Sequence, residues 1–294
     1  MKSVNYMNLS KSLQLLYLFF VVFFTVSCEL INPAEEIPSY IYVDEFTLST
    51  NLLEEGENTH NINDVWIYIE GEFIGIFELP AEIPVLASGE NEILLYPGIK
   101  VNGIAASRDK YPFYSNYTTS ETLSPYESDE DILKLSPNVQ YLSETVFEWI
   151  ENFEDAGLTL DTTYNSTTKI QIKNESGNNF GFISLDDSHI DFECISNDAF
   201  VLPQNNTPVY LELDYKNNLN FQIGLIISNP SSTDIQPVIS LNPIENWNKI
   251  YIDLTYFVVQ NINASSFIIF IAASKTDEID TAEIYIDNLK LIHF

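Results

Sequence analysis

Cysteine and histidine are too scarce in this chain to build a disulfide framework or a common metal centre. Only Cys28 and Cys194 occur, whereas small disulfide-stabilised domains need several cysteines. The three histidines, His60, His189 and His293, lie far apart, and none has metal-ligand spacing. The sequence also lacks a phosphate-binding glycine loop, a dinucleotide fingerprint and a Gly-x-Ser-x-Gly elbow. We therefore predict that the protein is not an enzyme.

Basic residues are scarce as well. The chain has 12 Lys and Arg against 43 Asp and Glu, which gives a formal net charge of -31 at pH 7. Such a surface repels phosphate backbones, so nucleic acid is excluded as a partner. Neutral glycans, protein partners and divalent cations remain compatible with it. The acidic residues are spread among apolar and aromatic ones, which excludes a disordered acidic tail.

Residues 1–27 have the pattern of a secretory signal peptide. Two lysines give a basic start, an almost wholly apolar stretch follows, and Ser27 stands directly before Cys28. The apolar core is short for a relaxed membrane span. The ending FTVSC resembles the lipobox of bacterial lipoproteins, in which the cysteine thiol is acylated and becomes the first mature residue. The alternative is an uncleaved signal anchor with a chance cysteine.

The lipobox resemblance implies a lipid anchor at Cys28 and therefore attachment to a membrane. Residues 28–39 are polar and acidic and contain two prolines, which is typical of a tether. Glutamates soon after the cysteine resemble those of surface-exported lipoproteins of the Bacteroidota. That likeness implies the outer membrane, with the protein at the cell surface or on the periplasmic face. Cys194, which then has no partner, lies in an alternating stretch and is predicted to be a buried thiol in a strand.

Residues 40–143 contain short β runs separated by turn signals, which is typical of a small β-sandwich. Residues 65–69 and 73–77 are predicted to form a hairpin around Glu70-Gly71, and Asn102-Gly103 predicts a type I′ turn. The run VWIYIEG and the later IG, LP and GENEI resemble the PEGA and carboxypeptidase-regulatory-like sandwiches. These are non-catalytic modules of bacterial envelope proteins.

Residues 111–117 hold four aromatic side chains in seven positions. Aromatic rings can stack on the apolar faces of sugars, but such residues more often form a sandwich's own core. We favour the core interpretation for this run.

Residues 144–294 contain long strand-like runs, no helical period over three turns, and loops rich in Asn, Ser, Thr and Pro. This pattern predicts a jelly-roll sandwich. The chain is therefore predicted to be all-β, with two β-sandwich domains after the signal peptide.

Three stretches of this second domain resemble the carbohydrate-binding-module (galactose-binding-like) jelly rolls. They are NFE at 152–154, the strand at 247–254 and the ending EIYIDNLKL at 283–291. The resemblance implies a glycan ligand. It also implies a structural calcium that ties the first strand to the last, with Glu154 and Asp287 as candidate ligands. Alternatively, Asp287 accepts backbone N–H bonds at a strand kink.

Strand parity predicts a ligand face in the second domain. Alternation places Tyr210, Glu212, Gln222 and Tyr251 opposite the apolar residues of their strands. If these strands share a sheet, its open face mixes aromatic and hydrogen-bonding groups, as sugar sites do. One solvated face is also usual in antiparallel sheets, and that simpler interpretation is favoured. Trp247 is predicted to be a core anchor.

The sequence thus predicts a non-catalytic envelope lipoprotein that binds a glycan through its C-terminal jelly roll. The alternative is an envelope scaffold whose sandwiches dock other proteins and bind no sugar. Two carboxylates alone do not identify a glycosidase, so a polysaccharide-active enzyme is the third hypothesis.

Overall fold

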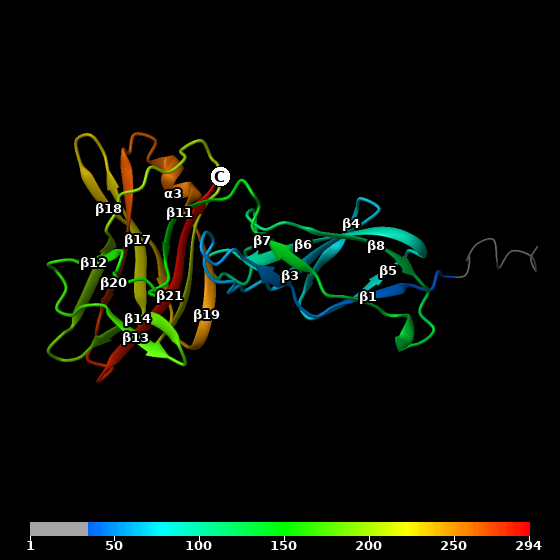
Figure 1. Ribbon diagram of the computed structural model, residues 1–294, viewed down its shortest axis with the longest axis horizontal. Helices are drawn as coiled ribbons and strands as arrows, with labels where there is room; N and C mark the ends of the chain where they lie inside the picture. Colours follow the sequence, from blue (N-terminus) through cyan, green and yellow to red (C-terminus); the bar gives the residue numbers. More distant parts are fainter. Residues whose placement is uncertain (1–34) are drawn as a thin grey trace, which may run out of the picture.

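The computed structural model describes residues 35–294. Cys28 and the signal peptide therefore lie outside the described residues. Figure 1 shows two bodies side by side along the long axis, with residues 35–38 leading into the first one at its far end. Nearly all regular structure in the described part is β, so the predicted all-β fold is confirmed. Within residues 35–294, no helix has the length and apolarity that a membrane crossing requires.

The first body is a sandwich of short strands around one apolar core. One layer holds the sheets β5-β1-β9 and β10-β2, and the other holds β4-β3-β6-β7 with β8 paired to β6. The strands are β1 (Ser39–Val43), β2 (Thr47–Ser49), β3 (Asp64–Ile69), β4 (Glu72–Glu78), β5 (Ala81–Val85), β6 (Gly89–Lys100), β7 (Arg108–Lys110), β8 (Tyr117–Leu123), β9 (Leu133–Leu135) and β10 (Asn138–Gln140), with a 3-10 turn η1 (Asp129–Asp131).

Two turns of this sandwich follow the sequence prediction. Glu70 and Gly71 have positive φ angles of 50° and 79° and connect β3 to β4. Asn102 and Gly103 have φ angles of 55° and 67° and connect β6 to β7. Glycine and asparagine tolerate this left-handed region, which is why such pairs mark tight hairpins.

The second body is a jelly-roll sandwich of two larger sheets. The first sheet has the order β13-β14-β21-β16-β19, with β11 also paired to β21, and the second is β12-β15-β20-β17-β18. The elements are β11 (Val146–Glu151), β12 (Leu160–Thr162), β13 (Gln171–Glu175), β14 (Asn178–Leu185), β15 (Asp191–Ser196), β16 (Val209–Asn217), β17 (Phe221–Ser228), β18 (Thr233–Leu241), β19 (Ile244–Asp253), α3 (Thr255–Gln260), β20 (Ser266–Ser274) and β21 (Ala282–His293).

The jelly-roll core lies between the inner faces of its two sheets. Alternation along each strand sends one set of side chains inward, so Leu211 and Leu213 on β16 and Ile250 and Ile252 on β19 are buried in it. Cys194 on β15 is fully buried among these apolar residues and forms no disulfide within residues 35–294. Burial raises the pKa of its thiol, and the predicted buried thiol in a strand is confirmed.

Candidate functional site

The first domain covers part of the outer face of the six-stranded sheet. Tyr210 and Glu212 on β16 and Tyr251 on β19 point to this outer face, as parity predicts, and β16 pairs directly with β19. Their exposed fractions are only 7%, 0% and 1%. Figure 1 shows β19 on the side of the jelly roll that faces the first domain. The predicted open ligand face is therefore wrong at these three residues, because another domain occupies it.

Gln222 does not belong to that face. It lies on β17, an inner strand of the opposite sheet between β20 and β18, and its side chain is exposed. There it lines a hollow of about 270 Å³ with Asn220, Ser240 and Ser274 and two alanines. The assumption that the three strands share a sheet is thus wrong for β17. A ligand contact at Gln222 stays a prediction, separate from the other three residues.

A buried ionic cluster lies at the junction of the two domains. The Glu212 carboxylate accepts hydrogen bonds from the hydroxyls of Tyr111 at 2.6 Å and Tyr141 at 3.0 Å. Lys249 Nζ lies 3.2 Å from its other oxygen. Burial and the Glu212 charge raise the pKa of both tyrosine hydroxyls. Because a buried charge is costly without partners, this cluster requires the two domains to stay together.

Lys290 completes the cluster from β21. Its ammonium is buried and donates to the carbonyl oxygen of Glu57 at 2.6 Å. Burial, reinforced by the neighbouring charge of Lys249, lowers the pKa of Lys290 to about 8. Lys249 behaves differently: burial alone would lower its pKa, but Asp214 and Glu212 outweigh that effect and raise it. The first domain thus supplies the backbone carbonyl oxygen that accepts a hydrogen bond from the buried Lys290 ammonium.

Two loops of the first domain attach it to the β19 strand. The backbone N–H of Asn61 donates to the Tyr251 hydroxyl at 2.9 Å, and its side chain donates to the Lys249 carbonyl oxygen at 2.9 Å. In the β6–β7 turn, the Asn102 N–H donates to the Tyr251 carbonyl oxygen at 2.9 Å. Asn102 Oδ1 accepts from the Asp253 N–H at 2.8 Å. The predicted hairpin turn therefore also docks the domains.

The aromatic run at 111–117 belongs to this junction. Tyr111, Phe113 and Tyr114 are almost fully buried, and the Tyr111 ring centroid lies 4.6 Å from that of Tyr251. Tyr117 is half-buried on β8. The core interpretation of this run is therefore confirmed, and its rings are not an open sugar platform.

The uncovered part of the same sheet face carries an aromatic cluster. The Trp247 side chain on β19 is 40% exposed. Its ring centroid lies 5.7 Å from Phe180 on β14 and 6.3 Å from Tyr285 on β21. Lys216 Nζ sits 4.3 Å from the Tyr285 centroid and 5.2 Å from that of Trp247. We call Trp247, Tyr285, Phe180 and Lys216 the aromatic platform.

A hollow of about 230 Å³ adjoins the platform. Its lining mixes carboxylates, amides and one ammonium with a ring edge: Lys216, Asn217, Asn218, Ile244, Glu245, Glu283 and Tyr285. The Tyr285 hydroxyl donates to Glu283 at 2.9 Å, and burial together with that carboxylate raises its pKa to about 12. Convergent polar groups beside aromatic rings are the composition of a small-molecule site.

Sequence analysis missed this site because Trp247 was assigned to the core. The structure corrects that assignment: Trp247 faces outward, since its neighbour Lys249 also lies on the outer face and Ile250 lies on the inner one. Strand parity counted back from Ile250 would have placed Trp247 beside Tyr251 on the same face. What parity does not show is which end of the strand the other domain covers.

The two candidate calcium ligands lie beside adjacent residues of β14. The Glu154 oxygens accept bonds from the backbone and side chain of Asn179 at 2.7 and 2.8 Å. Asp287 accepts from the Asn178 side chain at 2.9 Å and the Asn288 N–H at 2.8 Å. Burial raises the pKa of Asp287 to about 7. In residues 35–294, no three His, Cys, Asp or Glu side chains are grouped to hold a metal ion.

Calcium at Glu154 and Asp287 therefore stays a prediction, and the amide contacts support the alternative in which protein groups satisfy Asp287. If calcium binds the native state, adding EGTA will lower the thermal midpoint, because a ligand that binds only the folded chain stabilises it. An Asp287→Asn variant should then lose the effect of calcium. A thermal midpoint that does not change with calcium or EGTA would contradict calcium binding at this site.

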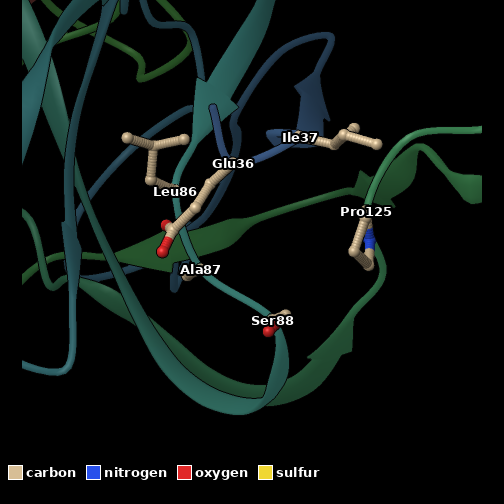
Figure 2. A pocket seen from close by; sticks show the side chains of 6 residues that line it. All are labelled: Glu36, Ile37, Leu86, Ala87, Ser88 and Pro125. Atoms are coloured by element: carbon tan, nitrogen blue, oxygen red, sulfur yellow. The ribbon is translucent and has the colours of Figure 1, made fainter. Parts of the chain in front are cut away.

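A further hollow, of about 400 Å³, lies at the far end of the first domain. Figure 2 shows it between the segment that enters β1, the end of β5 and the loop after β8. Its lining is Glu36, Ile37, Leu86, Ala87, Ser88 and Pro125. Among the described residues, one carboxylate and no aromatic ring line it, so this lining does not favour a sugar.

No family model matches the chain, and no curated protein matches it. Among solved structures, the chain is similar to the CBM22-2 xylan-binding domain of Xyn10C from Paenibacillus barcinonensis. The identity is 14%, the alignment covers 50% of this chain and 99% of that one, and the TM-score is 0.36. The family 11 carbohydrate-binding module of Lic26A-Cel5E from Clostridium thermocellum is also 14% identical, with coverages of 50% and 95% and a TM-score of 0.36. A family 29 carbohydrate-binding module is 15% identical, with coverages of 51% and 88% and a TM-score of 0.34.

Proposed function

We propose that this protein is a non-catalytic envelope lipoprotein whose jelly roll binds a neutral glycan on the aromatic platform. The observation that carries the proposal is the Trp247 indole, 40% exposed and next to Tyr285, which itself lines a polar hollow. Ring faces of Trp and Tyr present large apolar area with little entropy to lose, and they match the apolar faces of pyranoses. The amides and carboxylates of the hollow would accept and donate hydrogen bonds to the hydroxyl groups.

A neutral ligand fits the charges around the platform. Glu245 and Glu283 line the hollow with only Lys216 to oppose them, and Glu175 lies 3.9 Å from the Lys216 ammonium. The chain as a whole carries a formal charge of -31. The negative charges would repel an acidic polysaccharide at close range, whereas they would not repel a neutral glycan.

A glycan array probed with residues 29–294 tests the proposal, since this fragment contains every described element. We expect binding to neutral oligosaccharides and none to sulfated or uronate-rich ones. An absence of binding to every glycan on the array would contradict glycan binding and favour the scaffold hypothesis. Release of reducing ends from any polysaccharide would contradict the non-catalytic part.

The tether supports the localisation part of the proposal. Cys28 would carry the lipid, and residues 28–39 would hold a regulatory-like first sandwich near the outer membrane. A Cys28→Ala variant is expected to lose acylation and to move from the membrane fraction to the soluble fraction, because one cysteine provides the whole anchor. A Cys194→Ala variant, which alters the buried thiol, is the matched control. Unchanged membrane retention of Cys28→Ala would refute the anchor.

A further inference from the structure

Strand β4 is a free sheet edge with unusual composition. It pairs with β3 on one side, and no strand in the described part of the chain pairs with its other side. Three of its apolar side chains are well exposed: Phe73 at 50%, Ile74 at 38% and Ile76 at 43%. Between its terminal glutamates the strand contains no charge and no proline. An edge like this presents unpaired backbone groups that can bind another strand.

The other edge of the same sheet exposes polar side chains instead of apolar ones. Strand β8, which pairs with β6, exposes Thr118, Ser120 and Thr122. These side chains offer a second strand little apolar surface to cover. The contrast within one sheet shows that the apolar character of β4 is not simply a property of the whole sheet surface.

The β4 sequence is the same in both directions. Glu72-Phe73-Ile74-Gly75-Ile76-Phe77-Glu78 is symmetric about Gly75. If a second β4 strand pairs antiparallel around a two-fold axis at Gly75, isoleucine lies opposite isoleucine and phenylalanine opposite phenylalanine. Such an interface is isologous, because the same patch on each copy meets itself. The β3–β4 register shifts by one residue at Ile74, which lies within the paired segment, and Gly75 to Glu78 pair regularly with β3.

The two ends of β4 each carry a glutamate. In that register Glu72 of each copy lies opposite Glu78 of the other. Glu78 is already neutralised, because its carboxylate lies 3.2 Å from Arg108 and 3.5 Å from Lys100. Hydrogen bonding and charge from Arg108 lower the pKa of Glu78. Because Arg108 also pairs with Asp64, the approaching Glu72 meets two cations that two carboxylates already balance.

We propose that β4 is the dimerisation edge of this protein, and that its partner is β4 of a second copy. The pairing joins two five-stranded sheets into one continuous sheet across the two-fold axis. Contact along one strand buries little area, so the dimer is weak in solution and depends on protein concentration. This inference is independent of glycan binding, since the platform lies on the other domain.

Sedimentation equilibrium of residues 29–294 over a range of concentrations tests the dimer. The parent is expected to show a monomer–dimer equilibrium. Ile74→Lys places a charge at the edge, and we expect it to be monomeric at every concentration. The matched control is Ile172→Lys, which changes another exposed isoleucine, 44% exposed on the β13 edge, and should dimerise like the parent. A purely monomeric parent, or equal dimerisation of parent and Ile74→Lys, would overturn the proposal.

Cysteine cross-linking tests the register. Ile74 lies opposite Ile76 of the second copy, so an Ile74→Cys variant mixed with an Ile76→Cys variant should form a disulfide-linked dimer under mild oxidation. Each variant alone should cross-link far less, because identical positions lie two residues apart, beyond disulfide reach. Equal cross-linking of the single variants and the mixture would overturn the two-fold axis at Gly75.

Discussion

Replacing Glu212 by alanine is expected to lower the free energy of unfolding by roughly 3–5 kcal/mol. The Glu212 carboxylate is fully buried. It accepts hydrogen bonds from Tyr111 and Tyr141 and forms an ion pair with Lys249. Removing it leaves the Lys249 ammonium buried beside a cavity with one fewer counter-charge. The two tyrosine hydroxyls also lose their acceptor, and unsatisfied buried donors are costly.

Urea denaturation followed by circular dichroism measures this effect. The matched control is Glu175→Ala, which removes a carboxylate 3.9 Å from Lys216 with a side chain 68% exposed. Exposed ion pairs contribute little, so the control should stay within about 1 kcal/mol of the parent. Equal stability of Glu212→Ala and Glu175→Ala would mean that the buried cluster does not stabilise the docked domains.

Replacing Tyr251 by alanine is expected to separate the unfolding of the two domains. Its side chain is 1% exposed, contacts the Tyr111 ring and accepts the Asn61 N–H. Truncating a buried aromatic residue costs about 3–5 kcal/mol. Because these contacts cross the junction, the loss falls on domain docking. We expect one calorimetric transition for the parent and two for the variant.

Tyr256→Ala is the control for this experiment, since Tyr256 is an exposed tyrosine on α3, 65% exposed, in the same domain. It should leave one transition, with stability within about 0.5 kcal/mol of the parent. If Tyr251→Ala also unfolds in one unchanged transition, the first domain does not depend on Tyr251 for docking, and the explanation given for its burial is wrong.

Local patterns in the sequence predicted much of the fold. Alternation correctly separated Glu212 and Tyr251 from the apolar residues of β16 and β19, which form the core, because side-chain direction in a strand follows parity. The turn at Asn102-Gly103 was predicted because few residue pairs adopt two left-handed conformations in succession. These features depend on neighbouring residues alone.

Long-range pairing explains what the sequence did not predict. Gln222 was grouped with Glu212 because both face outward, but the sheet to which a strand belongs is decided by distant partners such as β20. The burial of Tyr251 depends on Asn61, 190 residues earlier. The Trp247 side chain stays exposed because the first domain covers the other end of β19 and does not reach it. A periodic pattern carries no information on such docking.

Isothermal titration of a neutral oligosaccharide identified on the array, into the parent and into Trp247→Ala, tests the central claim most directly. Tyr164→Ala serves as the control, because Tyr164 is 96% exposed and lies outside the platform, and thermal melts verify that both variants fold. The account predicts that Trp247→Ala weakens binding by at least about tenfold, or 1.4 kcal/mol, while Tyr164→Ala binds like the parent. Equal affinity of the parent and a folded Trp247→Ala variant would contradict it.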